Sequence, residues 1–186
     1  IRRILPVMWA AATLLERQFP GAAFIVAAPS AQVADWIKTT LAAQPHGPAC
    51  WSVVIGQTRQ VLRQARAAMV TSGTATIEAA LLGCPMVVVY KTSWLTYALG
   101  RLVIRVPFLG MVNLVAGYNA AAPQALCPEF IQHRATPSAL ATGLAALIAD
   151  GAARQQMLQG LAQVAEALGE PGAAERAAQI IRQELR

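Results

Sequence analysis

Short apolar runs alternate along the chain with segments whose apolar residues recur every three or four positions. The runs at Ala23–Ala28, Trp51–Ile55, Ala67–Thr71 and Met86–Tyr90 have the length and continuity of buried strands. Helical spacing is found over residues 4–15, 31–41, 58–65, 75–82 and 94–105. Apolar strands separated by helices predict an α/β fold, with a Rossmann-like parallel sheet and helices on both faces.

The C-terminal part of the chain shows only the helical pattern. From Pro137 onward leucines recur at helical spacing, and a final helix is predicted after Pro171. We therefore expect a Rossmann-like domain over residues 1–136 and a helical C-terminal tail over residues 137–186 that packs on the same domain. Two passages before the tail have weaker patterns. Residues 110–117 are predicted to be a loop, and residues 129–132 to begin a short helix.

The turn after the third predicted strand is the best candidate for a binding site. Ser72, Gly73 and Thr74 stand where a buried strand gives way to a helix. The first amides of a helix have no partner within it and the dipole is positive there, so this turn suits a phosphate group. Glu78 follows one helical turn later and is expected to accept sugar hydroxyls in the same crevice. The alternative is a capped helix with a solvated glutamate.

Composition narrows the class of protein. The 186 residues are 56% hydrophobic and 13% charged, which is typical of a globular domain and excludes a disordered chain. The net charge of +6 favours an anionic ligand or membrane surface, whereas the scattered arginines argue against nucleic acid. Neither a signal peptide nor a transmembrane helix is expected. Because the chain starts inside a helical pattern and without Met, we expect it to be a fragment.

Cysteines and histidines give no sign of a disulfide or a metal site. Cys50, Cys84 and Cys127 are far apart, and His46 and His133 have no second ligand nearby in the sequence. We expect no metal, no cofactor, and reduced, buried cysteines in a cytoplasmic protein. Neither histidine belongs to a recognisable nucleophile–base pair, so the general base is expected outside this chain.

Other polar residues are candidates for ligand contacts, each with a structural alternative. Asn113 could hydrogen-bond a ligand or stabilise a turn. Glu129 could hydrogen-bond a ligand or complement the dipole of a short helix. Gln132 would lie on the same face of that helix as Glu129. Arg101 and Arg105 lie four residues apart on an apolar helix. They could rest on an anionic membrane surface or form the solvated face of a core helix.

Four motifs, in order along the chain, resemble those of the lipid-A-disaccharide synthase family. They are Ser72–Leu81, Cys84–Tyr90, Val106–Gly117 and Pro128–Gln132. The first motif alone would suggest only a glycosyltransferase of the class with two Rossmann domains, called GT-B. The similarity extends over essentially the whole chain.

The resemblance implies an enzyme of lipid A biosynthesis. Such an enzyme transfers a 2,3-diacylglucosamine unit from its UDP donor, UDP-2,3-diacylglucosamine, to a lipid acceptor, 2,3-diacylglucosamine 1-phosphate. It needs no metal and is peripheral to the inner membrane, at the cytoplasmic face. This chain resembles the C-terminal, donor-binding half of the GT-B fold, so we expect it to be inactive alone. A homodimer through the C-terminal helices is left open.

The resemblance also assigns site residues. The matching positions are Ile55, Gly56, Ser72, Gly73, Thr74, Glu78, Asn113, Glu129 and Gln132. The turn would hold the diphosphate, Glu78 the ribose hydroxyls, and the backbone at Ile55–Gly56 would border the uracil. Asn113 is assigned to catalysis and donor binding, Gln132 to donor binding, and Glu129 supports them.

Some features depart from the family pattern, and alternatives remain. The family's Leu-Pro-Gly-Ser-Arg loop and its acceptor domain lie outside this sequence. Arg66 replaces a common acidic residue and would add a positive charge near the nucleotide side, and Val112 replaces a usual proline. Another GT-B UDP-GlcNAc transferase or epimerase is one alternative. A non-catalytic nucleotide-binding domain is the other.

Overall fold

The computed structural model of the chain describes residues 1–103, 106–117, 124–169 and 172–185. The strands are β1 (Phe24–Ala28), β2 (Trp51–Ile55), β3 (Ala68–Thr71), β4 (Met86–Tyr90) and β5 (Glu129–Ile131). The helices of the first half are α1 (Leu5–Gln18), α2 (Ala31–Ala42), α3 (Thr58–Gln64), α4 (Thr74–Leu81) and α5 (Trp94–Val103). They are followed by α6 (Met111–Gly117), α7 (Pro137–Ile148), α8 (Ala152–Leu168) and α9 (Ala173–Glu184). The predicted strands and the main helices are confirmed.

All strand pairs of the described chain are parallel, but they form two sheets. One sheet has the order β1-β2 and the other the order β3-β4-β5. The predicted α/β class, with parallel strands and helices on both faces, is therefore confirmed, and the described strands fall into two hydrogen-bonded groups. Among the described residues no strand lies between β1 and β3, so the backbone hydrogen bonding of the strands stops there.

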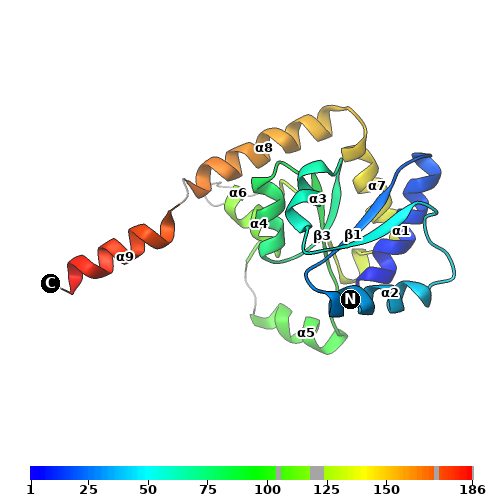
Figure 1. Cartoon of the computed structure of the whole chain (residues 1–186), viewed down its shortest axis with the longest axis horizontal. Coiled ribbons are helices and arrows are strands. Elements are labelled where there is room, and N and C mark those ends of the chain that lie inside the picture. The colour runs from blue at the N-terminus through cyan, green and yellow to red at the C-terminus, as the bar shows by residue number, and fades with distance from the viewer. Residues whose placement is uncertain (104–105, 118–123, 170–171, 186) are drawn as a thin grey trace.

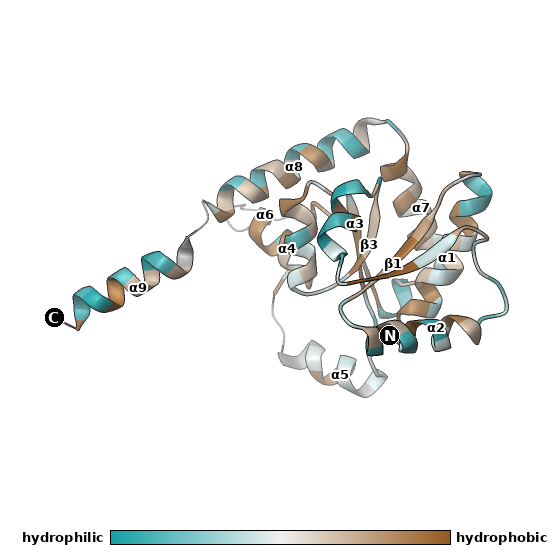
Figure 2. Ribbon diagram, viewed as in Figure 1, coloured by the Kyte–Doolittle hydropathy of each residue, from teal (hydrophilic) through white to brown (hydrophobic). Residues whose placement is uncertain are grey.

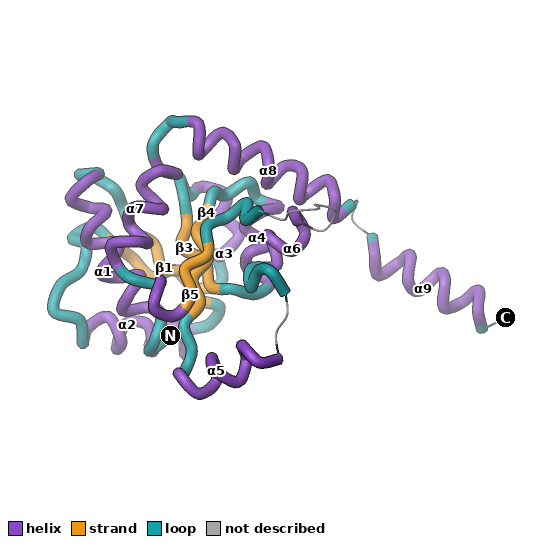
Figure 3. Tube along the Cα trace, turned by 180° about the vertical axis from the view of Figure 1, so that it is seen from behind, coloured by secondary structure: helices purple, strands orange, loops and turns teal. Residues whose placement is uncertain are grey.

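Helices cover both faces of these strands. On one face α2 contacts β1 and β2, α7 contacts β3 and β4, and α1 lies between α2 and α7. On the other face α3 contacts β1, α4 contacts β3, and α8 lies across α4 and α6. Figures 1 and 3 show these two layers from the front and from behind. This arrangement follows from the alternation of apolar strands and amphipathic helices.

The core is centred on β4. Its residues Met86–Val89 are at most 1% exposed, because helices pack on both of its faces. A second, smaller cluster surrounds Trp9 and Ala28 between α1, α2 and β1. Helix α1 contributes to both clusters, with Ala11 and Leu15 in the large one. The strands accordingly form the brown, hydrophobic centre of the molecule in Figure 2.

Two short elements differ from the sequence prediction. Residues 111–117, predicted as a loop, form α6, in which Val112 and Asn113 are fully buried. Glu129–Ile131, predicted to begin a helix, pairs with β4 as the edge strand β5, and a single 3₁₀ turn follows at Gln132–Arg134. Tertiary contacts override local preference in both segments, because a buried asparagine and an edge of β4 require partners.

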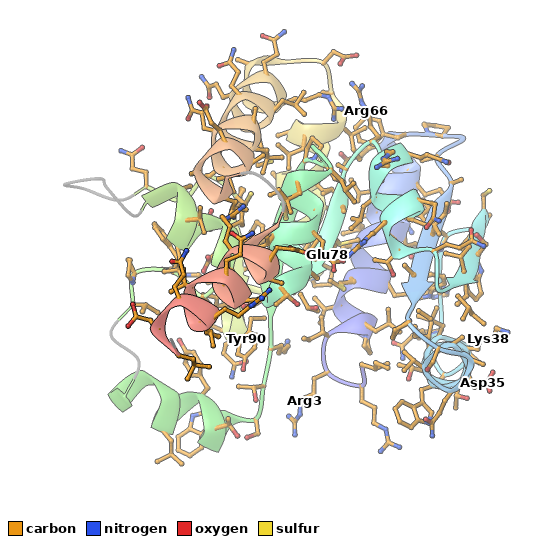
Figure 4. The ribbon with its side chains drawn as sticks, turned by 60° about the vertical axis from the view of Figure 1, so that its left-hand side comes forward. Arg3, Asp35, Lys38, Arg66, Glu78 and Tyr90 are labelled. Carbon is orange, nitrogen blue, oxygen red and sulfur yellow. The ribbon has the colours of Figure 1, made fainter. Side chains whose placement is uncertain are left out.

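Arg66 lies at the amino end of β3. Its guanidinium donates to the carbonyl oxygen of Ile148 at 2.8 Å and to Asp150, at the end of α7. Arg154 of α8 donates to the Arg66 carbonyl oxygen at 2.6 Å. Ligand sites in such sheets lie at the opposite, carboxyl edge. The expected position of Arg66 near the nucleotide side is therefore wrong, and Figure 4 shows it far from Tyr90 at the end of β4.

The C-terminal helices are of two kinds. Helices α7 and α8 pack on the core through buried leucines, among them Leu140 and Leu161. Helix α9 projects away from the body in Figure 1, and its Ile180 and Ile181 are 59% and 58% exposed. None of the helices within the described ranges has the length and hydropathy needed to cross a membrane.

The three cysteines are free, but they are not all buried. Cys84 and Cys127 lie in the core, whereas Cys50 is exposed, so the expectation of three buried cysteines is wrong for Cys50. Burial raises the pKa of the Cys84 thiol to about 11. Burial, followed by the nearby Glu129 carboxylate, raises the pKa of Cys127 to about 12. Both buried thiols are thus neutral and unreactive at neutral pH.

These pKa values predict selective labelling. At pH 8 a thiol reagent should modify Cys50 rapidly and leave Cys84 and Cys127 unmodified, as counted by mass spectrometry of the native protein. In denaturant all three should react. The two raised pKa values also predict that folding stability is fully present below pH 9 and falls as pH rises towards 11, because the unfolded chain releases those protons first. Rapid native labelling of Cys84 would contradict its burial.

Candidate functional site

The candidate residues meet at one edge of the sheets. Strands β2, β3 and β4 end at Ile55, Thr71 and Tyr90, and the loops that follow carry Gly56, Ser72–Thr74 and Lys91–Thr92. Because carboxyl ends of parallel strands share an edge, each sheet brings its own loops together there. Ligands of doubly wound folds bind at this edge.

The loop between β3 and α4 presents free backbone donors. The amides of Gly73, Thr74 and Ala75 have no acceptor within the described part of the chain. Gly73 has φ +141°, a conformation that favours glycine, and a Cβ there would meet no atom within 4 Å. The hydroxyl of Thr76 donates to the Gly73 carbonyl oxygen at 2.7 Å, which turns that oxygen inward. Three unpaired N–H groups at a helix start form a site for an anion.

Glu78 lies one turn along α4 from this loop. Its side chain is 41% exposed, and its Oε1 is 3.8 Å from the Arg59 guanidinium of α3. Figure 4 shows Glu78 in the middle of the molecule, on the side of α4 that faces α3. An exposed ion pair of this length contributes little to stability, so the carboxylate oxygens are available to hydroxyl groups.

The loop Ser72–Thr74 between β3 and α4 is called the anion loop below. Ser72 connects it to a second loop, which contains Leu109. Its hydroxyl donates to the Leu109 carbonyl oxygen at 2.6 Å, and its amide donates to Val89 of β4 at 3.2 Å. In this arrangement Ser72 orients the loop, while its neighbours Gly73 and Thr74 supply the free amides. Leu109 was not predicted as a site residue, because it acts through its backbone carbonyl and a backbone group has no signature in residue types.

Asn113 is fully buried in α6. Its Nδ2 donates to the Cys127 carbonyl oxygen and to Glu129 Oε1, both at 2.8 Å, and its Oδ1 accepts from the Cys127 amide at 2.8 Å. The side-chain amide thus mimics a backbone partner for Cys127. Both of its polar atoms face protein, so the structure places Asn113 behind the site.

Glu129 ties the start of β5 to the start of α6. One oxygen accepts from the Leu109 amide at 3.0 Å, and the other accepts from the Gly110 amide and from Asn113, both at 2.8 Å. The carboxylate therefore caps α6 at its positive end. A Cβ at Gly110 would lie 3.0 Å from Glu129 Oε1, so a larger residue there would require the carboxylate to move by a few tenths of an ångström.

Gln132 holds the loop after β4. Its Oε1 accepts from the Thr92 amide at 2.7 Å, and its Nε2 donates to the Thr92 carbonyl oxygen at 3.3 Å. Among the described residues other than glycine, Gln132 alone has a positive φ, at 51°. A residue other than glycine keeps a positive φ only where its surroundings hold it there. At Gln132 the two hydrogen bonds to Thr92 hold the residue in this conformation.

Ile55 and Gly56 lie at the end of β2, in the other sheet. The Gly56 amide donates to Ala28 of β1 at 2.9 Å, and its φ of +70° turns the chain sharply out of the strand. Ile55 is 46% exposed. Both residues therefore lie at the carboxyl edge, and the Ile55 side chain is partly exposed to solvent there.

A cavity of about 600 Å³ opens near the same edge. It is lined by Trp36 and two threonines of α2, by residues 1–4 and by Lys91 and Thr92. Arg2, Arg3 and Lys91 are its charged lining residues, all cationic. Such a cavity attracts anions. Ser72–Thr74 and Glu78 are not among its lining residues.

The structure therefore divides the predicted site residues into two groups. Gly73, Thr74 and Glu78 present groups to solvent at the carboxyl edge. Asn113, Glu129 and Gln132 bind protein atoms and fix the loops around that edge. Sequence reasoning missed three residues that contribute backbone groups: Leu109, Gly110 and Thr92. It also missed the buried hydroxyl of Thr76 and the ion pair of Arg59 with Glu78.

The parallel α/β architecture, with loops and a free helix start at the carboxyl edge, is that of a Rossmann-like domain, consistent with half of a GT-B glycosyltransferase. A family model described as "Lipid-A-disaccharide synthetase" matches residues 1–183. The chain belongs to the lipid-A-disaccharide synthase family, and the resemblance seen in its motifs is confirmed.

Individual relatives agree. A lipid-A-disaccharide synthase of Syntrophus aciditrophicus is 40% identical over 181 residues, covering 96% of this chain and 44% of the relative. Those of Anaeromyxobacter dehalogenans and Myxococcus xanthus are each 38% identical, over 179 and 182 residues. They are covered to 45% of their length, so the chain spans less than half of the curated relatives it matches.

The buried position of Asn113 predicts a stability defect. Asn113→Ala in the full-length protein leaves both Cys127 backbone groups without partners. We expect the free energy of unfolding, measured by urea denaturation, to fall by about 2–4 kcal/mol. Gln155→Ala on the exposed side of α8 is the control and should change it by less than about 0.5 kcal/mol. Unchanged stability with lost activity would show that Asn113 acts on the ligand instead.

Proposed function

We propose that this chain is the donor-binding half of a lipid-A-disaccharide synthase. The full-length enzyme would transfer a 2,3-diacylglucosamine unit from UDP-2,3-diacylglucosamine to 2,3-diacylglucosamine 1-phosphate, with UDP as the leaving group. The observation that carries this proposal is the set of three unpaired amides at the start of α4, with Glu78 one turn further on. Family membership supports the same reaction.

The anion loop would hold the diphosphate. The free amides of Gly73, Thr74 and Ala75 would face the diphosphate, where negative charge increases as UDP leaves, and would then stabilise the transition state more than the ground state. The positive end of α4 adds to this effect. Ser72 would keep the loop in position through Leu109.

Glu78 would accept hydrogen bonds from the ribose hydroxyls. Its distance of one helical turn from the anion loop matches the spacing between a diphosphate and the ribose attached to it. The backbone at Ile55–Gly56 would border the uracil. Asn113, Glu129 and Gln132 would act in donor binding by fixing the loops that surround it. A catalytic role for Asn113 stays a prediction.

Membrane association is proposed for α5. Trp94 and Leu99 on this helix are 78% and 57% exposed, and in Figure 1 the helix lies apart from the body at the end that carries the carboxyl edge. Exposed apolar residues on a basic chain suit a peripheral position at the inner membrane. The side chain of Arg101 is not described, and Arg105 lies outside the described residues.

The alternative functions receive less support. A different GT-B transferase or epimerase would share the anion loop and Glu78. The relatives and the family model name lipid-A-disaccharide synthase, so they do not favour that alternative. A non-catalytic domain would bind the nucleotide without turnover. Assay of the full-length protein for disaccharide formation separates it from the enzyme.

The ribose assignment predicts weaker nucleotide binding after Glu78→Ala. A hydrogen bond to a charged group contributes about 1.5–3 kcal/mol, so affinity for UDP should fall roughly 10- to 100-fold in calorimetry of the full-length protein. Arg59→Ala is the matched control, because it removes the ion pair and leaves the carboxylate in place. Equal affinity of wild type and Glu78→Ala would refute the assignment.

The diphosphate assignment predicts a different effect for Gly73→Ala. The new Cβ meets no neighbour, so the only penalty is the strained φ, and the loop should relax and move its amides. We expect UDP affinity to fall about tenfold or more while uridine affinity, measured in the same way, is unchanged. Gly151→Ala, before α8, is a control without positive φ. A parallel loss for UDP and uridine would contradict a phosphate-specific role.

A further inference from the structure

A second cavity, of about 460 Å³, lies at the amino end of β2. It is lined by Trp9 of α1, by the end of α2 with Lys38, by residues 44–48 of the following loop, and by Trp51, the first residue of β2. Figure 4 shows Lys38 at the margin of the molecule, well away from Glu78. The volume is within the range of small-molecule sites, about 300–1,000 Å³. None of the candidate donor-site residues lines this cavity.

The indole N–H of Trp9 is an unused donor in this cavity. Trp9 is only 6% exposed, yet its Nε1 bonds to no acceptor among the described residues. Each fully enclosed side-chain nitrogen or oxygen within the described ranges has a partner, so Nε1 belongs to the small part of Trp9 that reaches solvent. That part opens into the cavity, which Trp9 lines beside Gly47. A buried tryptophan usually gives its N–H to an acceptor, so this donor indicates the place for one.

The loop that forms one wall of the cavity is held in place by close packing and by a hydrogen bond. A Cβ at Gly47 would overlap Nε1 and two carbon atoms of the Trp9 indole. Because a rigid, buried ring cannot move aside as the end of a flexible side chain can, only glycine lets the loop backbone pack against it. Just beyond the loop, the Ala49 amide donates to Glu16 Oε1 of α1 at 2.6 Å. The wall is therefore fixed to α1 on both sides of the indole contact.

Trp51 supplies an aromatic surface. Its ring meets Trp9 edge to face, with the ring centroids 4.9 Å apart and the planes at 83°. Trp51 is 39% exposed, so part of its ring is open to a further partner. Aromatic rings attract one another in stacked and edge-to-face arrangements, and a third ring would extend this pair.

The charge of the cavity favours an anion. Lys38 is cationic and forms no ion pair within the described part of the chain. His46 adds an imidazole, and none of the described residues that line the cavity is acidic. Asp35, one turn before Lys38 on α2, lies outside the lining. A negatively charged ligand group would therefore be attracted to this end of the cavity.

We propose that this cavity binds a planar aromatic carboxylate. The Trp9 N–H donates to a carboxylate oxygen, Lys38 supplies the opposite charge, and the ligand ring packs on Trp51. A neutral apolar ligand leaves the Trp9 donor without an acceptor, and an inorganic anion leaves the Trp51 ring uncovered. Only a ligand that combines a ring with a carboxylate satisfies all three groups. The proposal rests on this cavity and not on the proposed transfer reaction.

The tryptophans of the full-length protein report where such a ligand binds. Their indole N–H resonances are recorded by NMR with isotope-labelled tryptophan, assigned by single substitutions to phenylalanine, and followed while 2-naphthoate is added. We expect the Trp9 resonance to shift with a dissociation constant of about 1 mM or lower, as is usual for a ligand of this size. Trp94, which lines neither cavity, is the control and should not shift. A Trp9 resonance that stays in place up to about 10 mM would overturn the proposal, whether or not Trp36 of the cationic cavity shifts.

A second titration tests the chemistry of the ligand. The amide 2-naphthamide has nearly the same shape as 2-naphthoate but no charge, and it should bind at least about tenfold more weakly. Lys38→Gln should weaken 2-naphthoate binding about threefold or more and leave 2-naphthamide binding unchanged. Arg63→Gln is the matched control, because it removes an exposed cation of α3 that does not line the cavity. Equal affinities for the two ligands, or wild-type affinity of Lys38→Gln for 2-naphthoate, would overturn the proposal.

Discussion

The hydrogen bond between Asn113 and Glu129, together with the bonds of both side chains to backbone groups, is the interaction on which the site depends. A buried amide and a half-buried carboxylate are costly unless their polar atoms are paired. Together they bond to Leu109 and Gly110, which directly precede α6, and to Cys127, which lies just before β5, so they join two segments separated in the sequence. The position of Leu109 in turn fixes Ser72 and so the anion loop. Removing one partner would leave the others unpaired in a low-dielectric interior, so the network acts as a unit.

The hydrophobic core is larger around the β3-β4-β5 sheet than around the β1-β2 sheet. The β3-β4-β5 half is enclosed by helices and contains the fully buried residues Met86–Val89. The β1-β2 half depends on a small cluster around Trp9 and on the edge-to-face contact between Trp9 and Trp51, whose ring centroids are 4.9 Å apart. Helix α1 is the connection between the halves, because it packs on α2 and on α7. Local unfolding is therefore expected to begin with β1 and β2, which have less buried apolar surface.

The sequence predicted the parts of this protein that depend on local pattern. The run Met86–Tyr90 is apolar at each position because both faces of β4 are covered. The helical spacing over residues 31–41 corresponds to α2, which Ser30 caps by accepting from the Val33 amide. Helix α6 was missed because it is only seven residues long and its third residue is polar. That polar residue, Asn113, is buried to serve Cys127, which the sequence places fourteen residues away. Strand β5 was missed because three residues carry too little periodicity to predict.

The candidate site was predicted only in part, because residue types indicate some of its groups and backbone atoms supply the others. A strand followed by a small polar turn and a helix is recognisable from residue types, so Ser72–Thr74 and Glu78 were found. The partners that fix this turn are backbone atoms of Leu109 and Thr92, and a backbone atom has no signature in a sequence. The division of the chain into two sheets also could not be predicted, since each strand has the same apolar character whether one or both edges are paired.

The two hydrogen bonds between the Gln132 side chain and the Thr92 backbone couple the loop after β4 to the turn after β5. Because one side chain binds both the amide and the carbonyl of Thr92, the loop after β4 cannot shift without changing the backbone at Gln132, which is already strained at φ 51°. A ligand that binds one arrangement of Lys91–Thr92 more tightly must also favour one conformation of the β5 end, and the coupling is equal in both directions. Lys91 and Thr92 line the cationic cavity, so a ligand bound there would contact a loop whose position is tied to the segment that carries Glu129.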